Sequence, residues 1–565
     1  MHLTPRVLTL TASIAWRHVT DDPVRAVLLA WRVLPPRLRP LTRAAGGYGR
    51  AAARWGAGER DEAFAGLADR PRRLAAFALA VDQPAVARAA LARLPGGDRY
   101  LSAHLAWREG RLSDAIDALG HDEDHEDHRN ERDDRKIRRL RRTLAAQQAL
   151  LADQSPASPQ PKNAKNASRR HAADIRVLHL VTDALPATSA GYTIRTHEIA
   201  RAQRAAGVDA HVVTALGFPV TKGVLDGRET VAVDGVPYHR LLPWTTRENQ
   251  QRDQHVRMAA ALTQRLRPDV LHAASNYRNA QVALALRARY QIPVVYEVRG
   301  FWEDTWLSRH PDEDALKDSE LYTSIRAAET ACMDQADLVV TLGEAMRDEI
   351  ASRGIAADKI QIVPNAVDES FLKPLEKKPH EEYLVGTVTT LTPHEGLGTL
   401  LQAVAILRER GVPARALIVG DGPEKAALQR QAENDGIPVT FTGRVPAAQV
   451  RDFHSLLDVF VVPRTRDRVC QLVTPLKPVE AMASGLCVVT SEVSALAEIV
   501  KHEVTGALTM AQDPVSLADC LEWLYHKPDV RDKLGGAARE WVAGDRTWSR
   551  NAERYRQAYR RLTLP

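Results

Sequence analysis

The spacing of hydrophobic residues divides the chain into two unlike parts. Over residues 1–120 the apolar positions recur at helical spacing, and three stretches each join a small-residue turn to an amphipathic helix: WGAGERDEAFAGL, AVDQPAVARAAL and WREGRLSDAIDAL. From residue 174 onward, continuous apolar runs such as IRVLHLVT and DVFVVP alternate with helical patterns, which is typical of buried parallel strands separated by helices. The pattern predicts an all-α N-terminal region followed by α/β structure.

The three helical stretches share a register. Ala63, Ala87 and Ala115 take equivalent positions in them. This repetition predicts degenerate helix–turn–helix repeats of the tetratricopeptide kind over residues 1–120, with a period shorter than the usual ~34 residues. We expect stacked hairpins of this kind to bind a partner or to cap a neighbouring domain.

Residues 121–173 have the composition of a connecting segment. The run HDEDHEDHRNERDDRK, from His121 to Lys136, mixes histidines with carboxylates but lacks the turn residues that would gather them around a metal. We interpret it as solvated. A short basic helix is expected over 137–151, and SPASPQPKNAKNASRR follows it. Its Pro, Ser and Asn residues are typical of a flexible linker.

Two successive arrays of alternating strands and helices occupy residues 174–368 and 369–540. Each array predicts a Rossmann-like, doubly wound domain. In LGTLLQAVAILRERG, for example, the apolar residues fall on one face of the helix, as covering a sheet requires. Ligands of such folds bind at the carboxyl ends of the strands, so the cleft between two facing domains is the expected site.

Composition and cysteine usage are those of an ordinary cytoplasmic protein. Of the 565 residues, 44% are hydrophobic and 26% are charged. No apolar run approaches the ~18 residues of a membrane span, and no signal peptide is recognisable. The four cysteines form no C-x-x-C pair, which favours buried thiols in a reducing compartment. We therefore expect a cytoplasmic location.

The net charge of +6 is concentrated near the N-terminus. Residues 1–56 contain nine arginines and only two acidic residues, Asp21 and Asp22. This excess favours contact of residues 1–120 with an anionic membrane surface, at the inner face of the plasma membrane, or with a protein partner. An Arg-rich coding bias is the alternative explanation. No nucleic-acid-binding motif accompanies the charge, so no nucleic-acid partner is expected.

Gly191 is the first candidate for ligand contact. It lies where the loop after the first strand meets its helix, in PATSAGYTIRTHEI, and a glycine there lets the backbone approach a phosphate or a sugar. A purely conformational role fits the sequence equally well. No G-x-G-x-x-G follows a first strand, which argues against a dinucleotide-dependent dehydrogenase.

The stretch VTPLKPVEAMASGLCVVTS, residues 473–491, places a cation and a carboxylate at the start of an apolar helix. Pro478 suits the first helical position, and we expect the amides of Val479 and Glu480 to face an anion beside Lys477. A cation at a helix start is locally unfavourable, which makes Lys477 a candidate functional residue. Glu480 is also explained by the favourable position of a carboxylate at a helix N-terminus.

Five motifs follow one another in the order and spacing of a known family: IQIVPNAVD, ALIVGDGPEKAALQRQAENDG, VTFTGRVPAAQV, LLDVFVVPR and PLKPVEAMASGLCVVTS. Over residues 174–560 the chain resembles retaining, nucleotide-sugar-dependent glycosyltransferases of the group 1 (family 4) type, which have the GT-B fold. YEVRGFWED and VTPLKPVEAMA are similar to the branch that assembles bacterial exopolysaccharides or surface glycans. The resemblance implies a helix over 541–565 that packs back on the first Rossmann-like domain.

The resemblance also implies an activity and its residues. The implied reaction moves a sugar from a nucleotide-sugar donor to an acceptor hydroxyl with retention of configuration; the acceptor is a glycan, a lipid-linked sugar or a small molecule, and no metal or cofactor is required. The residues implied in catalysis are Lys477, Arg464 and Arg299. The residues implied in donor binding are Glu480, on the ribose, with Lys477, Arg464, Gly443, Arg444, Val445 and Leu476. The residues implied on the acceptor side are Gly191, His197 and Arg299.

Some positions depart from the family pattern. Leu472 stands where many relatives carry the first of two glutamates, and Arg299 stands where a histidine is frequent. The loop TVTTLTPHEG lacks the Arg and Lys that grip the diphosphate in many relatives. Two alternatives therefore stay open: a nucleotide-sugar epimerase or hydrolase with the GT-B fold, and a catalytically weak scaffold protein.

Overall fold

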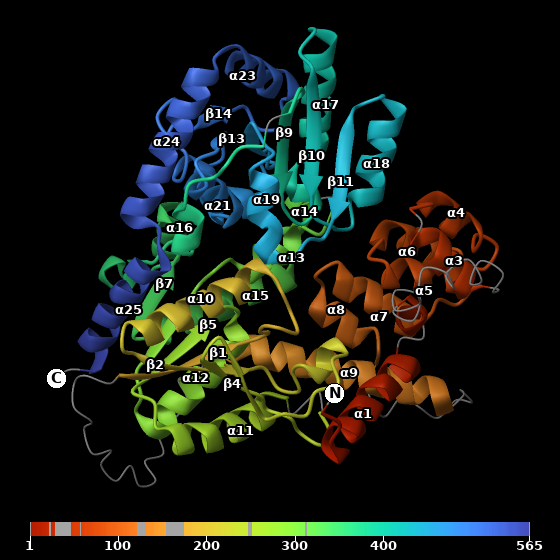
Figure 1. Cartoon of the computed structure of the whole chain (residues 1–565). Coiled ribbons are helices and arrows are strands. Elements are labelled where there is room, and N and C mark those ends of the chain that lie inside the picture. The colour runs from red at the N-terminus through yellow and green to blue at the C-terminus, as the bar shows by residue number, and fades with distance from the viewer. Residues whose placement is uncertain are drawn as a thin grey trace.

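The computed structural model contains two α/β domains, one above the other, with a lobe of helices at their side (Figure 1). The residues that it describes are 2–21, 24–28, 47–56, 58–120, 131–153, 175–246, 251–310, 313–378 and 380–563. The predicted order, helices first and then two α/β domains, is confirmed.

The first α/β domain is built on an eight-stranded sheet of order β3-β4-β2-β1-β5-β6-β7-β8. All neighbouring strands are parallel except β3 and β4. The strands are β1 (Arg176–Val181), β2 (Asp209–Thr214), β3 (Thr230–Val233), β4 (Val236–His239), β5 (Val270–Ala274), β6 (Val294–Glu297), β7 (Leu338–Thr341) and β8 (Ile360–Ile362). The helices are α10 (Gly191–Ala205), α11 (Gln251–Leu266), α12 (Tyr277–Tyr290), α13 (Trp302–Leu307), α14 (Glu313–Leu316), α15 (Glu320–Gln335) and α16 (Glu344–Ser352).

The position of strand β1 in the sheet explains why apolar residues do not alternate with exposed polar ones along it. Successive side chains of a strand point to opposite faces of the sheet. Leu178 and Leu180 pack in the cluster formed with α12 and α15, whereas Val177 packs with Tyr555 and Tyr559 on the other face. Both faces are covered by helices, so both sets of side chains are buried.

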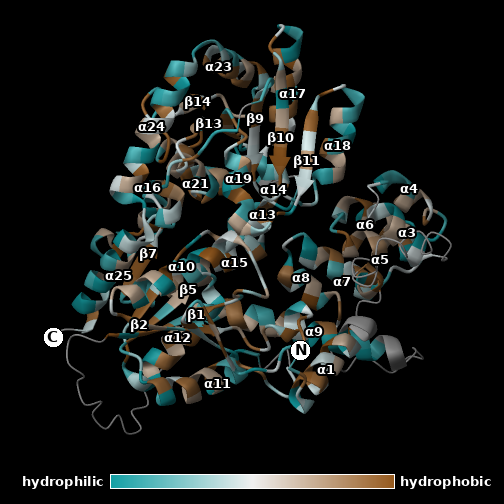
Figure 2. Ribbon diagram, in the orientation of Figure 1, coloured by the Kyte–Doolittle hydropathy of each residue, from teal (hydrophilic) through white to brown (hydrophobic). Residues whose placement is uncertain are grey.

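The second α/β domain has a six-stranded sheet, all parallel, of order β11-β10-β9-β12-β13-β14. Figure 2 shows hydrophobic residues along strand β10 and hydrophilic ones on outward helix surfaces. The strands are β9 (Tyr383–Val388), β10 (Ala414–Val419), β11 (Val439–Gly443), β12 (Val459–Val462), β13 (Cys487–Ser491) and β14 (Ala507–Thr509). The helices are α17 (Leu397–Glu409), α18 (Lys425–Asn434), α19 (Val450–His454), α20 (Arg468–Leu472), α21 (Lys477–Ala483), α22 (Ser494–Ala497), α23 (Pro514–His526) and α24 (Pro528–Asp545). Short 3₁₀ turns are η2 (Val220–Lys222), η4 (Ala357–Lys359), η5 (Glu369–Leu372), η6 (Pro393–Glu395) and η7 (Ala447–Gln449).

Helix α25 (Trp548–Thr563) joins the end of the chain to the first domain. It lies against α10, and the hydroxyls of its two buried tyrosines bond to first-domain side chains. Tyr555 donates to the Glu297 carboxylate (3.0 Å), and Tyr559 lies 2.6 Å from Nδ1 of His272. The C-terminal helix thus packs on the first domain.

The helical lobe consists of antiparallel hairpins. The hairpins are α3–α4, α5–α6 and α7–α8. In each hairpin the second helix carries one of the three aligned alanines, and all three alanines are fully buried: Ala63, Ala87 and Ala115. The repeated register is therefore a packing register; its likeness to tetratricopeptide repeats stays a prediction. Within the described part of residues 2–153, the helices with defined bounds are α1 (Pro5–Asp21), α3 (Tyr48–Gly56), α4 (Arg60–Ala65), α5 (Pro71–Ala80), α6 (Pro84–Leu91), α7 (Arg99–Arg108), α8 (Leu112–Asp117) and α9 (Glu131–Ala152).

Two N-terminal segments differ from the sequence-based expectation. Helix α1 stands apart from the hairpins and packs Val7 and Leu10 against Val220 and Leu242 of the first α/β domain. Helix α9 begins at Glu131, inside the run expected to be solvated linker, and buries its apolar residues against α8 and α15. Tertiary packing of its Leu side chains explains the difference. The remainder of the expected linker, 121–130 and 154–173, lies outside the described residues.

Among the described helices, none combines the length and the apolar character that a membrane crossing requires.

The buried carboxyl of Glu329 on α15 predicts a pH dependence of stability. Burial, and next the nearby Glu303 carboxylate, raise its pKa to about 8; it accepts a hydrogen bond from the Tyr277 amide (2.9 Å) and contacts the Tyr296 hydroxyl. The folded state holds a proton that the unfolded chain releases above its usual pKa of about 4.3. The Glu329 contribution to stability is therefore complete below that value and falls by about 1.4 kcal/mol per pH unit up to about pH 8.

Glu329→Gln mimics the neutral carboxyl, so it should remove this slope. Urea unfolding of both proteins between pH 5 and pH 8, an interval of about 3 units inside the window, measures the effect. Parallel stability curves for the two proteins would show that Glu329 is ionised in the folded state.

Candidate active site

A cavity of about 260 Å³ lies between the two α/β domains, where strands of both sheets end. On one side it is lined from α10, from the loops after β6 and β7, and from the segment that connects the domains. On the other side it is lined by the ends of β9 and β12, by residues that follow these strands, and by the segment that leads into the start of α21. The lining residues are Gly191, Tyr192, Arg195, Arg299, Leu342, Asn365, Thr387, Thr389, Thr390, Glu395, Val462, Arg464 and Val473 to Pro478. The expected position, at the carboxyl ends of parallel strands, is thus occupied by a cavity.

Lys477 and Glu480 pair with one another at the start of α21. The helix begins at Lys477, one residue earlier than expected, and Pro478 is its second residue. The Lys477 ammonium donates to Oε2 of Glu480 (2.9 Å), and its side chain is 32% exposed. The carboxylate at the next turn compensates the unfavourable position of the cation.

The expectation that two amides of α21 face an anion is wrong for one of them. The Glu480 amide donates to the Leu476 carbonyl inside the helix (3.2 Å) and is not available to a ligand. The cationic character of this edge of the cavity therefore depends mainly on the Lys477 side chain.

Arg464, at the end of β12, is held from two directions. It donates to Oε1 of Glu395 (2.7 Å) and to the Val473 carbonyl (3.0 Å). Burial alone would raise the pKa of Glu395, but Arg464 lowers it below its usual value; Glu395 in turn raises the pKa of Arg464. The pair is charged and fixed at the cavity wall.

A glycine makes this pair geometrically possible. Gly396 has φ +66°, and a Cβ at this position would lie 1.9 Å from the Pro463 carbonyl oxygen. Only a residue without a side chain lets the loop after β9 come this close to the end of β12. The close approach carries Glu395 to Arg464.

Arg299 lies across the cavity and is fixed by Glu297. It donates to Oε2 of Glu297 (2.8 Å), to Oγ1 of Thr196 (2.6 Å) and to the Tyr192 carbonyl (2.9 Å). Its side chain is only 8% exposed. This ion pair holds one cation at the cavity wall.

A second guanidinium, that of Arg195, pairs with the other oxygen of the Glu297 carboxylate. Arg195 on α10 donates to Oε1 of Glu297 (2.8 Å) and to the carbonyls of Val363 and Pro364. Burial would raise the pKa of Glu297, but Arg299 and Arg195 lower it well below its usual value. His272 completes the group through Nε2 (3.0 Å) and is fully buried, so it belongs to the core and not to the cavity wall.

The other residues named from the sequence fall into two groups. Gly191 and Leu476 line the cavity and lie close to one another, since a Cβ at Gly191 would lie 3.6 Å from Leu476 Cδ1. His197 lies outside the cavity lining and bonds to Tyr238 (2.9 Å) and Asp234 (3.0 Å). Gly443 ends β11, and Arg444 and Val445 follow it; none of these three residues lines this cavity.

Several cavity residues were not expected from the sequence, among them two polar residues and an arginine that join distant segments. Arg195, Asn365 and Thr474 all line it, and the Asn365 side chain donates to the Thr474 carbonyl across the two domains (2.7 Å). Arg195 is one of several arginines on its helix, and Asn365 lies near the expected end of the first Rossmann-like domain at residue 368. Their partners are more than 100 residues away in sequence, so no local pattern marks them.

In the described part of the chain, His, Cys, Asp and Glu side chains form no group of three that could hold a metal ion.

The Arg464–Glu395 pair predicts an effect on stability. Arg464→Met keeps much of the side-chain length but leaves the Glu395 carboxylate buried and unpaired, so we expect the free energy of unfolding to fall by about 3–5 kcal/mol. Urea denaturation followed by circular dichroism measures it. Adding Glu395→Gln should recover part of the loss, because it removes the unpaired charge. Arg466→Met, at an exposed position nearby, is the control; an equal loss in it would contradict the buried-pair assignment.

Comparison with known proteins gives two family matches. Residues 190–366 match the model of the glycosyl transferase 4-like domain, and residues 368–541 match that of the glycosyl transferases group 1. In sequence the chain is 30% identical over 228 residues to the GDP-mannose-dependent alpha-(1-6)-phosphatidylinositol monomannoside mannosyltransferase of Mycobacterium tuberculosis, covering 38% of this chain and 59% of that protein. It is 27% identical over 191 residues to the amylovoran biosynthesis glycosyltransferase AmsK of Erwinia amylovora, covering 33% and 47%.

A solved structure shares the fold. Sucrose-phosphate synthase from Thermosynechococcus elongatus superposes with a TM-score of 0.57 at 20% identity, over 68% of this chain and 99% of that one. The alignments span about three fifths or less of the two curated relatives, whereas the structural match spans nearly all of its counterpart. The chain therefore carries a glycosyl transferase 4-like domain followed by a glycosyl transferases group 1 domain, in the GT-B arrangement.

Proposed function

We propose that this protein transfers a sugar from a nucleotide-sugar donor to an acceptor hydroxyl, with retention of configuration, in the assembly of an exopolysaccharide or another surface glycan. The observation that carries the proposal is the cavity between the domains, with Lys477, Arg464 and Arg299 in its wall. Three cations around one cavity suit a ligand with several negative charges. The named substrate of the mycobacterial relative is a nucleotide sugar, and AmsK acts in the biosynthesis of amylovoran.

The three cations differ in how firmly they are held. Arg464 and Arg299 are fixed by buried carboxylates, whereas Lys477 is one-third exposed and has only its helix neighbour Glu480. Fixed charges stabilise a developing charge without the cost of reorganisation. We infer that the two arginines set the potential of the cavity and that Lys477 contacts the diphosphate, while Glu480 accepts hydrogen bonds from the ribose.

Charge at these positions favours bond cleavage over simple binding. When the glycosidic bond breaks, negative charge grows on the departing nucleoside diphosphate, and cations beside it stabilise the transition state more than the bound donor. The acceptor would enter beside Gly191 and Arg299, from the first-domain side. In this proposal the cationic side chains take the place of a metal ion, and no cofactor is needed.

The direct test is a transfer assay. Nucleotide sugars are first screened by thermal shift, since a ligand that binds only the folded state raises the melting temperature. The donor found is then incubated with glycan and lipid-linked acceptors, and nuclear magnetic resonance reads the anomer of the product. A product with the anomeric configuration of the donor, formed also in EDTA, is expected.

Three outcomes contradict the proposal in different ways. Free sugar or an epimer formed without acceptor would indicate a hydrolase or epimerase. An inverted anomer would exclude retention. A protein whose melting temperature responds to no nucleotide sugar would have the scaffold role instead.

Lys477 and Glu480 should fail differently when replaced. Lys477→Ala removes a charge-assisted contact of roughly 1.5–3 kcal/mol, so turnover should fall about 10- to 150-fold. Glu480→Gln weakens a ground-state contact and should mainly raise the Michaelis constant for the donor. Lys501→Ala, at an exposed position of the same domain, is the control. If both variants melt at a lower temperature but keep the donor affinity, the Lys477–Glu480 pair only stabilises the start of helix α21.

Exposed residues near the N-terminus suggest that the protein binds its acceptor at a membrane surface. Helix α1 exposes Leu8 (53%) and Trp16 (71%), and Trp244 of the first domain is 55% exposed with the Arg6 guanidinium over its ring (5.5 Å). Exposed apolar and aromatic groups beside cations suit the headgroup region of an anionic membrane. We infer a cytoplasmic protein that docks peripherally at the inner face of the plasma membrane.

Vesicle sedimentation tests the docking. The wild type should sediment with vesicles containing phosphatidylserine at low salt and be released at high salt, because surface charges are screened. Leu8→Ser/Trp16→Ser should weaken sedimentation, and Val224→Ser, an exposed apolar position outside α1, should not. If the wild type does not sediment with these vesicles, residues 1–120 would instead bind a protein partner.

A further inference from the structure

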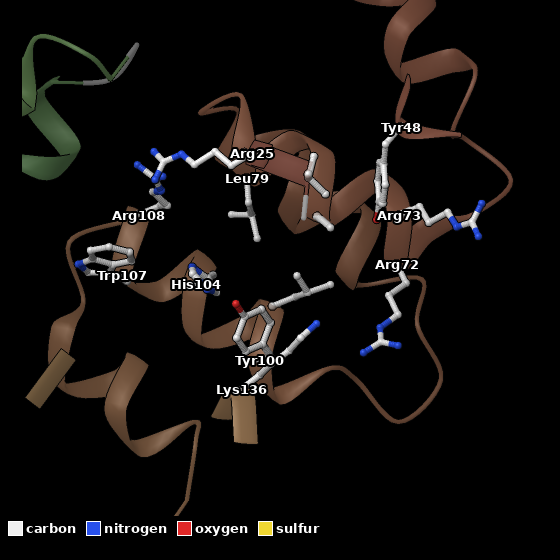
Figure 3. A pocket seen from close by; sticks show the side chains of 14 residues that line it. Arg25, Tyr48, Arg72, Arg73, Leu79, Tyr100, His104, Trp107, Arg108 and Lys136 are labelled. Carbon is white, nitrogen blue, oxygen red and sulfur yellow. The ribbon is translucent and has the colours of Figure 1, made fainter. Parts of the chain in front are cut away.

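The helical lobe contains a second cavity, far in sequence from the one between the domains. Its volume is about 310 Å³, and it lies among helices α3, α5, α7 and the first turns of α9. Figure 3 shows the fourteen side chains that line it. The volume falls at the lower end of the range of small-molecule sites, about 300–1,000 Å³.

The charge of the lining is one-sided. Among the fourteen described lining residues none is acidic, and five are cationic: Arg25, Arg72, Arg73, Arg108 and Lys136. Figure 3 shows Arg25 and Arg108 at one edge of the hollow and Arg72 and Arg73 at the opposite edge, with Lys136 between them beside Tyr100. A concave surface with one sign of charge concentrates ions of the opposite sign.

Two of these arginines are oriented by carboxylates that are not part of the lining. Arg72 Nε lies 2.6 Å from Asp98 Oδ2, and Arg108 Nη1 lies 3.3 Å from Asp82 Oδ1. Asp98 also caps helix α7 by accepting from the Leu101 amide. These contacts hold the guanidinium groups at the edges of the cavity.

Aromatic rings make up much of the remaining wall. Tyr100 and His104 meet edge to face, with their centroids 4.7 Å apart, and Trp107 follows at 6.0 Å from His104. The Arg108 guanidinium lies 5.6 Å from the Trp107 ring centroid. Flat, half-buried rings with polar edges offer stacking faces to a ligand that is itself a ring.

The lobe is attached to the first domain beside the candidate active site. Nε2 of His310 lies 3.1 Å from the Arg108 carbonyl, and the Leu321 amide donates to the Gly110 carbonyl (2.8 Å). The segment that receives the lobe, from α13 to α15, starts directly after Arg299 and Gly300. The lobe that holds this cavity is thus bonded to the first domain, the domain beside which the acceptor is proposed to enter.

We propose that the cavity of the helical lobe binds a short acidic saccharide, one whose sugar rings stack on the aromatic wall while its carboxylates or phosphates pair with the surrounding cations. The choice of a saccharide rests on the proposed function, because the acceptor there is a surface glycan. The requirement for an anionic ring compound rests on the cavity alone. Its small, concave form suits such a ligand better than an extended polypeptide or a flat membrane.

Isothermal titration calorimetry with the full-length protein tests the proposal. The probes are tetragalacturonate, which carries carboxylates, its fully methyl-esterified form, which keeps the rings but not the charge, and glucose 6-phosphate. The wild type should bind tetragalacturonate or glucose 6-phosphate, and the ester should bind at least about 10-fold more weakly, as expected for the loss of one charge-assisted contact. The probe that binds identifies the anion.

Two matched double variants locate the site. Arg72→Gln/Lys136→Gln removes two charges from the cavity, and Arg50→Gln/Arg93→Gln removes two from exposed positions of the same lobe outside it. The first should weaken binding of the acidic probe at least about 10-fold, and the second should leave it unchanged. Circular dichroism melting of both confirms that the lobe is folded.

The opposing results are equally definite. Failure of both acidic probes to bind, equal affinities in the two double variants, or tighter binding of uridine monophosphate than of either acidic sugar would overturn the proposal. Titration of uridine diphosphate into the same proteins reports on the cavity between the domains. Loss of that signal alone would count against the proposed transferase function and not against the saccharide site.

Discussion

The burial of one carboxylate, that of Glu297 at the end of β6, organises the parts that meet at the candidate active site. A charge removed from water persists only when it is paired and hydrogen-bonded. Arg299 supplies one partner and is thereby fixed in the cavity wall. Arg195 supplies another and also binds the Pro364 carbonyl of the interdomain connection, while Tyr555 brings in the C-terminal helix. One ionic group thus ties the sheet, the connection and helix α25 to the same cavity.

Polar contacts between the two domains enclose that cavity from several sides. Asn365 reaches the Thr474 carbonyl, and the Glu498 carboxylate of the second domain accepts hydrogen bonds from the first amides of α16. Arg468 pairs with Glu349 on the same helix (2.7 Å). Helix α16 therefore meets the second domain through both its N-terminus and its side. The cavity between the domains depends on how these contacts set the distance between two sheets that share no strand.

The helical lobe extends the first domain rather than standing as a separate unit. Its α8 is bonded through Ser113 to the Glu320 carboxylate (2.6 Å), and α9 buries Leu144 in the core shared with α12 and α15. In the segment from α13 to α15, α15 contacts α8 and α9 of the lobe, and α13 contacts α20 of the second domain. A ligand held in the lobe would therefore be bound to a unit that packs on the domain presenting Arg299. This arrangement connects a basic, aromatic cavity to a site where a glycan is proposed to react.

The sequence by itself determined the elements and their buried faces. The face of α17 that carries Leu400 and Leu407 is buried as its spacing predicts, and the conflict of Lys477 with its helix start marked a cavity residue. Tertiary structure alone decided which side chains meet. Arg464 meets Glu395 and His197 turns to Tyr238, away from the cavity. The reason is physical: periodicity fixes which face of an element leaves water, but the partners on that face come from distant segments and are chosen by packing.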